Sequence, residues 1–193
     1  EFDGTTVDST KWNVLGDWQR RPGSPYPGWW TKGNAVLDGQ GHLVLLTSFN
    51  AASSRYESGA VRSSGKFEHR FGYFEARMLA KEQNYPGHWP AFWLMSGGVN
   101  NVDGSGRDGS EIDVMEKPWT IDRISHAIHW DGYDSSHQAL GFQSTPAGVS
   151  SGYHTYGVWW SATEYIFYVD GNETWRTTAG GVSQVAEYLK LTD

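Results

Sequence analysis

The feature that most constrains the fold is a series of short runs in which apolar and polar residues alternate, two of them followed by a turn that contains glycine. The clearest runs span residues 56–62, 66–77, 154–160 and 164–169. Alternation places successive side chains on opposite faces, as in a β-strand with one buried face. Ser-Ser-Gly joins the first two runs and Asp170-Gly171 follows the last, so we expect hairpins at both turns. The pattern predicts an all-β protein.

The composition limits the size, the partners and the surface of the protein. A chain of 193 residues suffices for one domain with a substantial core. The 11 Trp residues are many for a mean hydropathy of −0.57, so we expect some rings to line a groove where sugars stack. A net charge of −7 without a basic cluster argues against nucleic acid as a partner. No apolar stretch reaches membrane-spanning length, and cysteine is absent, so disulfides play no part.

The segment from Glu111 to Glu116 holds three carboxylates within six residues. On a regular strand Glu111 and Asp113 share one face, whereas Glu116, five positions after Glu111, points to the other. One extra residue near Met115, accommodated as a β-bulge, returns Glu116 to the acidic face, and bulges are over-represented beside active sites. We therefore predict a bulged strand that presents all three carboxylates on one face.

Such a face suits the chemistry of a retaining glycosidase. With the bulge, the backbones of Glu111 and Glu116 are about 13 Å apart. Side chains that lean toward each other then approach the carboxyl separation of roughly 5 Å that retention requires. One carboxylate attacks the anomeric carbon and the other protonates the leaving oxygen, so their pKa values must differ. Asp113 between them is placed to hydrogen-bond the nucleophile and to keep the acid protonated. The alternative is a solvated acidic strand face without catalytic function.

The sequence Glu-Ile-Asp-Val-Met-Glu resembles the Glu-x-Asp-x-x-Glu signature of glycoside hydrolase family 16, in its bulged, laminarinase-like form. The resemblance also covers residues 56–77, 87–95 and 153–170. It implies that Glu111 is the nucleophile, Asp113 the assisting residue and Glu116 the general acid/base of a double displacement with retention. It further implies an antiparallel β-jelly-roll sandwich whose concave sheet forms an open cleft, so that cleavage is internal, and it implies no required cofactor.

Three tryptophans are candidate sugar contacts. Trp30 lies in the loop-like, aromatic-rich segment 17–32, which we expect to form one wall of the cleft; the alternative is an aromatic plug at the end of the sandwich. Trp89 and Trp93 share a face if their segment is extended, and we place Trp89 at the substrate floor with Trp93 near it. Either of these two rings is instead a core residue in the alternative interpretation.

Three polar residues complete the predicted substrate contacts. By resemblance Asn34 matches a family position that hydrogen-bonds sugar near the cleavage point, and Arg77 lies near the cleft; the alternative for Arg77 is a surface ion pair with Glu75. His126 and His129 have opposite parity, so only one faces the cleft on a regular strand. The family analogy selects His129 and places it to hydrogen-bond Glu116. The same parity argues against a metal site made of these two histidines.

The resemblance also bears on the extent of the chain and on calcium. It implies a single catalytic domain over residues 1–193 that begins inside the family's opening strand and ends before a final strand. Family enzymes often carry a structural calcium that involves both ends of the chain, and Glu1 and Gly41 are the candidate contacts here. The family further implies a secreted or extracytoplasmic monomer.

The predicted partner is a β-linked polysaccharide. A β-1,3-glucan of the laminarin type is the first choice, on family frequency and on the bulged motif. An endo-β-galactosidase acting on galactose-containing glycans is the alternative, favoured by the segment His129-Trp-Asp-Gly-Tyr133. A non-catalytic carbohydrate-binding jelly roll is the alternative from another class, and the three carboxylates argue against it because a lectin needs no pair of graded pKa values.

Overall fold

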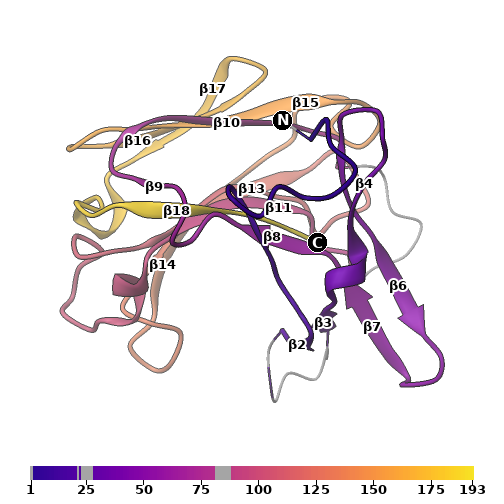
Figure 1. Cartoon of the computed structure of the whole chain (residues 1–193). Helices are drawn as coiled ribbons and strands as arrows, with labels where there is room; N and C mark the ends of the chain where they lie inside the picture. Colours follow the sequence, from indigo (N-terminus) through magenta and orange to yellow (C-terminus); the bar gives the residue numbers. More distant parts are fainter. Residues whose placement is uncertain (1, 21, 23–27, 81–87) are drawn as a thin grey trace. The chain divides into compact units, whose positions relative to one another are not determined.

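The computed structural model describes residues 2–20, 22, 28–80 and 88–193, and nearly all of its regular structure is β-strand (Figure 1). The chain forms two compact units, Glu1–Phe67 with Lys190–Asp193, and Glu68–Leu189. No helix among the described residues is long and apolar enough to cross a membrane.

The first unit contains short strands and a single-turn helix. They are β1 (Asn13–Val14), β2 (Trp18–Gln19), β3 (Gly28–Trp30), η1 (Lys32–Asn34), β4 (Ala35–Leu37), β5 (Leu43–Leu45), β6 (Thr47–Asn50), β7 (Arg55–Ser58) and β8 (Ala60–Arg62). One sheet has the order β2-β3-β7-β6, β4 pairs with β5, and β8 pairs with β1 and with residues 190–192. The β3–β7 pair is parallel, whereas the other pairs of this unit are antiparallel.

The second unit contains longer strands. They are β9 (Glu68–His69), β10 (Gly72–Met78), β11 (Ala91–Met95), η2 (Gly97–Asn100), β12 (Glu111–Glu116), β13 (Ile124–Trp130), β14 (Gln138–Ser144), β15 (His154–Trp160), β16 (Tyr165–Val169), β17 (Asn172–Thr177), η3 (Ala179–Gly181) and β18 (Glu187–Thr192), whose last residues belong to the first unit. One sheet runs β18-β11-β12-β13-β14, and the other runs β10-β15-β16-β17. Figure 1 shows β10, β15, β16 and β17 as one layer and β11, β13 and β14 in the layer that faces it.

The core of the second unit lies between these two sheets, and the alternation in the sequence is its cause. On β15, Tyr156, Val158 and Trp160 are fully buried, whereas Trp159 between them is 44% exposed. Ile112 of β12 and Ile128 of β13 are fully buried in the other sheet. Full burial of each such side chain stabilises the fold by about 1.5–3 kcal/mol. The sheets are therefore held by one apolar layer.

One predicted hairpin is wrong. The runs 56–62 and 66–77 alternate as expected, but Gly59 separates β7 from β8, and β9 and β10 divide the second run. β8 pairs with β1, whereas β10 pairs with β15 over seven residues. The Ser-Ser-Gly segment therefore joins β8 to β9, which both pair with β18 and not with each other. The predicted hairpin at Asp170-Gly171 is confirmed by the pairing of β16 with β17.

The bulge predicted in the acidic strand is confirmed. Along β11 the pairing passes from Phe92 opposite Met115 to Trp93 opposite Asp113, which leaves Val114 without a partner in the register. Along β13 the register likewise shifts between Asp113 and Glu116. Ile112, Val114 and Met115 are fully buried, whereas Glu111 and Glu116 are half-buried. The extra residue therefore turns Glu116 away from the core.

Candidate active site

The three predicted carboxylates lie on one strand and differ in their surroundings. Glu111 is opposite His129, and Asp113 is opposite Ala127 of β13 and Trp93 of β11. Asp113 is 3% exposed, while the two glutamates remain partly open. One carboxylate thus sits deep between two that solvent and a ligand can reach.

Glu116 accepts two hydrogen bonds from neighbouring elements. The indole N–H of Trp89 donates to Glu116 Oε1 over 2.6 Å, and the hydroxyl of Ser125 donates to Oε2 over 3.4 Å. Burial raises the pKa of Glu116 above its usual value, and the charge of Glu111 raises it further, while the Trp89 hydrogen bond and the charge of His129 oppose the rise. Glu116 therefore keeps its proton to higher pH than a solvated glutamate does, as a general acid requires.

Glu111 has a partner that the sequence analysis missed. The hydroxyl of Tyr133 donates a hydrogen bond to Glu111 Oε2. Burial raises the pKa of Tyr133 strongly, and the charge of Glu111 adds to the effect, so Tyr133 stays protonated and acts as a donor. Tyr133 follows Asp131 and Gly132, both with positive φ, at the end of β13. That turn signal was visible in the sequence, but the direction in which it sends the next side chain was not.

Asp113 contacts His129, and this corrects the role predicted for the histidine. His129 Nε2 lies 3.1 Å from Asp113 Oδ2, and its Nδ1 lies 2.9 Å from Nε2 of His137. His129 therefore acts on Glu116 through its charge rather than through the predicted hydrogen bond. One carboxylate oxygen of Glu111, one of Asp113 and a ring nitrogen of His129 lie within 4.8 Å of one another, so the three side chains form a compact cluster. As parity predicted, His126 points the other way and is fully buried.

The predicted aromatic contacts fall in different environments. Trp89 is 42% exposed beside Glu116, and Trp93 is partly buried opposite Asp113, so both neighbour the carboxylates. Trp30 belongs to the first unit and is only 8% exposed, packed with Leu15 and Ala60. Its buried ring leaves little surface for a sugar, which favours the structural interpretation for Trp30.

The two other polar residues predicted to contact substrate, Arg77 and Asn34, do not lie on the strand that carries the carboxylates. Arg77 lies on β10, in the sheet that does not contain β12, and its guanidinium stacks 4.2 Å from the centre of the Tyr153 ring. It shares the exposed face of β10 with Tyr73 and Glu75, so the prediction that Arg77 lies near the cleft is wrong. Asn34 belongs to the first unit, where its amide donates to the Glu57 carbonyl over 2.9 Å. Its contact with sugar stays a prediction.

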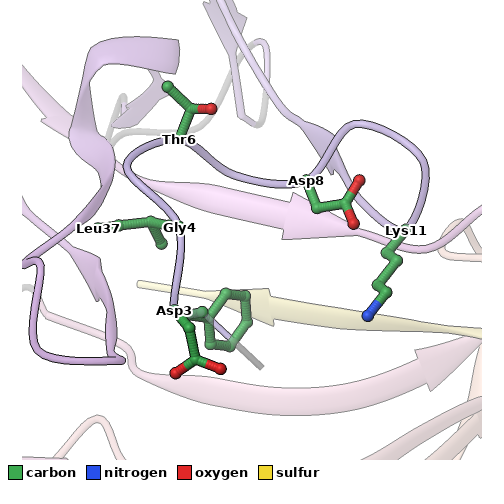
Figure 2. Close-up of a pocket in the computed structure, with 7 residues that line it drawn as sticks. Asp3, Gly4, Thr6, Asp8, Lys11 and Leu37 are labelled. Carbon is green, nitrogen blue, oxygen red and sulfur yellow. The ribbon is translucent and has the colours of Figure 1, made fainter.

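The predicted calcium contacts lie at the start of the chain. Glu1 is outside the described residues, whereas Gly41 forms a β-bridge with Phe2. A Cβ added to Gly41 would lie 3.2 Å from Asp3 Oδ1, so a carboxylate is close to this backbone. Figure 2 shows Asp3 and Asp8 in the lining of a hollow that also includes Lys11. Carboxylate and carbonyl oxygens suit Ca²⁺. Asp3 therefore offers carboxylate oxygens beside Gly41, and the calcium site stays a prediction.

Comparison with known proteins establishes the family. A family model described as the glycoside hydrolase family 16 domain of β-porphyranases A–D matches residues 1–188. The chain belongs to glycoside hydrolase family 16. Members of family 16 are endo-acting glycosidases with a characteristic retaining mechanism, as the acidic motif predicted.

Two curated relatives differ in substrate. The chain is 30% identical over 209 residues to glucan endo-1,3-beta-glucosidase A1 of Niallia circulans, covering 93% of this chain and 30% of the relative. It is 28% identical over 184 residues to keratan-sulfate endo-1,4-beta-galactosidase of Sphingobacterium multivorum, covering 92% and 42%. This family 16 chain therefore spans less than half the length of these two relatives.

A solved structure supports the fold. A family 16 endo-glucanase from Bacteroides ovatus matches with a TM-score of 0.80 at 20% identity, covering 99% of this chain and 83% of that one. The predicted all-β antiparallel jelly roll is confirmed. At this identity the likeness shows the fold alone.

Proposed function

We propose that this family 16 chain hydrolyses internal bonds of a polysaccharide by double displacement, with Glu111 as nucleophile, Glu116 as general acid/base and Asp113 as the assisting residue. The observation that carries the proposal is that two glutamates share one strand face in different environments. Burial and the neighbouring charge favour the protonated form of Glu116, and Tyr133 donates to the carboxylate of Glu111. A retaining glycosidase needs this division between an acid and a nucleophile.

The proposed first step forms a glycosyl–enzyme. Tyr133 holds Glu111 Oε2, which leaves Oε1 to attack the anomeric carbon while Glu116 gives its proton to the glycosidic oxygen. The bond from the anomeric carbon to the leaving oxygen breaks, and the leaving chain departs with a hydroxyl. Trp89 donates to the Glu116 carboxylate that this proton transfer leaves behind.

The proposed second step releases the bound sugar. Glu116, now ionised, takes a proton from water, whose oxygen attacks the anomeric carbon and displaces Glu111. Asp113 lies between the two glutamates in sequence, and its carboxylate contacts the imidazole of His129. It thereby orients His129, whose charge lowers the pKa of Glu116 and offsets part of the rise due to burial.

For the substrate we propose a galactose-containing polysaccharide, with porphyran and keratan sulfate first to be tested. The support is the family model, described for β-porphyranases, which spans residues 1–188, and the 28% identity to a keratan-sulfate endo-1,4-beta-galactosidase. This reverses the order of preference from the sequence alone. A β-1,3-glucan is the second candidate, favoured by 30% identity over 93% of the chain to a glucan endo-1,3-beta-glucosidase. We further propose that the protein is a monomer that acts outside the cytoplasm, where such polymers occur.

The test is product analysis after incubation with porphyran, agar-type galactan, keratan sulfate, laminarin and mixed-linkage glucan, side by side. Oligosaccharides from a galactan alone support the first substrate, and oligosaccharides from laminarin alone replace it with the second. Glu111→Gln and Glu116→Gln serve as controls for contaminating activity. Binding to a polymer without release of reducing ends would instead support a carbohydrate-binding module and overturn the catalytic proposal.

A further inference from the structure

The bulge in β12 leaves backbone groups that the sheet itself does not pair. Val114 has no partner in the register of β11 or of β13, and both Val114 and Met115 face the single residue His126 across the β13 pairing. Val114 is fully buried, so its carbonyl has no access to water. A buried backbone carbonyl requires a hydrogen-bond partner. A side-chain donor that binds this carbonyl can therefore hold the bulge in place.

His126 supplies that donor from the core side of the sheet. Its Nδ1 lies 2.7 Å from the carbonyl oxygen of Val114. The imidazole is fully buried and packs at 4.9 Å, centre to centre, on the ring of Phe167 from the facing sheet. Because a carbonyl oxygen only accepts, Nδ1 must carry a proton. His126 thus faces away from the active site but contacts Val114, the extra residue of the bulge.

Thr174 fixes the tautomer of His126. Burial lowers the pKa of His126 to about 4, so the ring is neutral at ordinary pH and its Nε2 is an acceptor. The Thr174 hydroxyl lies 2.9 Å from Nε2 and 3.2 Å from the carbonyl oxygen of Phe167. The hydroxyl has a single proton, and we assign it to the shorter contact, in which Thr174 donates a hydrogen bond to Nε2. A chain of hydrogen bonds thus runs from β17 through His126 to the bulge.

We propose that His126 is a positioning residue for the acid/base: by holding the carbonyl of Val114, it fixes the bulge that turns Glu116 onto the catalytic face. The inference rests on the proposed role of Glu116. Without the bulge a register slip by one residue would send the side chains beyond it to the opposite face. Because bulges re-aim side chains beside active sites, the group that fixes one controls the geometry of the reaction.

The pKa of Glu116 provides a readout that a merely structural role of His126 would not move. The charged and titratable groups that act on Glu116 are Glu111 on its own strand and His129 on β13, while Trp89 and Ser125 donate hydrogen bonds to it. Burial raises its pKa, so a Glu116 that loses the bulge and turns toward the core should titrate at higher pH. The basic limb of the pH–rate profile should move in the same direction.

The decisive variants are His126→Leu, which removes the donor, and His126→Asn, whose amide N–H can reach the Val114 carbonyl. The measurement is a ¹³C NMR titration of the Glu116 carboxyl, assigned with Glu116→Gln, and it needs no substrate. We expect His126→Leu to raise the pKa of Glu116 further, and His126→Asn to return it most of the way to the wild-type value. On any polymer that the wild type cleaves, a displacement of about 1 Å should lower kcat about 100-fold with little change in KM.

The control is Val158→Ala on β15, which opens a cavity in the same core but keeps the His126 donor; it should lower the Tm while leaving the Glu116 titration unchanged. If His126→Leu does not fold, Thr174→Val removes the hydroxyl that donates to His126 Nε2, and we expect a smaller shift in the same direction. A folded His126→Leu with a wild-type titration, or a shift equal to that of Val158→Ala, overturns the proposal. Failure to find a substrate overturns only the proposed function, because the titration is independent of activity.

Discussion

Replacing the buried carboxyl of Glu187 by an amide should stabilise the protein at alkaline pH. Glu187 lies on β18 and is fully buried. Its Oε1 accepts from the backbone N–H and from the hydroxyl of Ser110, each over 3.1 Å, and Oε2 has no hydrogen-bond partner among the described residues. Burial raises the pKa of Glu187 from 4.5 to about 7, and the charge of Glu111 adds to the rise. Glu187→Gln keeps an acceptor for Ser110 and removes the charge.

The size of the effect follows from linkage. Between pH 4.5 and about 7 the native protein binds more protons at Glu187 than the unfolded chain does, so the wild-type free energy of unfolding falls as the pH rises. Each pKa unit corresponds to about 1.4 kcal/mol, so the ionised carboxylate costs about 3 kcal/mol above pH 7. The cost is nearly absent below pH 4.5, where both states are protonated. For a domain of this size the difference in Tm at alkaline pH is about 10 °C.

Thermal unfolding of the wild type and of Glu187→Gln at pH 4.5, 6 and 8 measures this pH-dependent difference in stability. We expect the variant to gain stability relative to the wild type as the pH rises, mostly below pH 7. The matched control is Glu173→Gln, the same change at an exposed carboxylate whose pKa is lowered by hydrogen bonds from Arg176. The control should show no gain with rising pH. A Glu187→Gln variant whose advantage is the same at all three pH values would show that the pKa of Glu187 is not raised in the folded protein.

Three further substitutions test the site. Trp89→Phe removes the donor that lowers the pKa of Glu116, so the basic limb of the kcat/KM profile should move up by about one pH unit; an unmoved limb would contradict this. Tyr133→Phe removes the hydrogen bond to Glu111 and should lower kcat/KM about 10-fold in steady-state assays, with no loss of fold by circular dichroism; wild-type kcat/KM would exclude Tyr133 from the mechanism. Arg77→Ala, on the other sheet, should leave kcat/KM unchanged, and a large loss would return Arg77 to the cleft.

Local pattern was sufficient to predict most of the strands and the bulge. Alternation around Tyr156, Val158 and Trp160 is the direct consequence of one buried sheet face. The bulge was predictable because three acidic residues could share a face only if one residue were skipped. The pairing of strands was harder to predict: the partners of β10 on β15 lie 76 to 88 positions later in the chain, and nothing in the Ser-Ser-Gly turn indicates so distant a partner.

The parts of the site that escaped prediction depend on contacts between distant segments. Tyr133 reaches Glu111 only because a turn of two residues with positive φ redirects the chain after β13. Arg77 was misplaced because alternation tells which residues share a face but not which sheet the strand joins. Trp30 was also misplaced: its loop-like segment suggested an exposed ring, yet the ring packs with Leu15 and Ala60.

The most direct test of the account is covalent trapping of the glycosyl–enzyme. The wild type is incubated with an activated 2-deoxy-2-fluoro glycoside of the sugar that it cleaves, and the labelled peptide is identified by mass spectrometry. The account predicts one sugar on Glu111 and no label on Glu111→Gln. A label on Glu116, or rapid turnover of the polymer by Glu111→Gln, would contradict it.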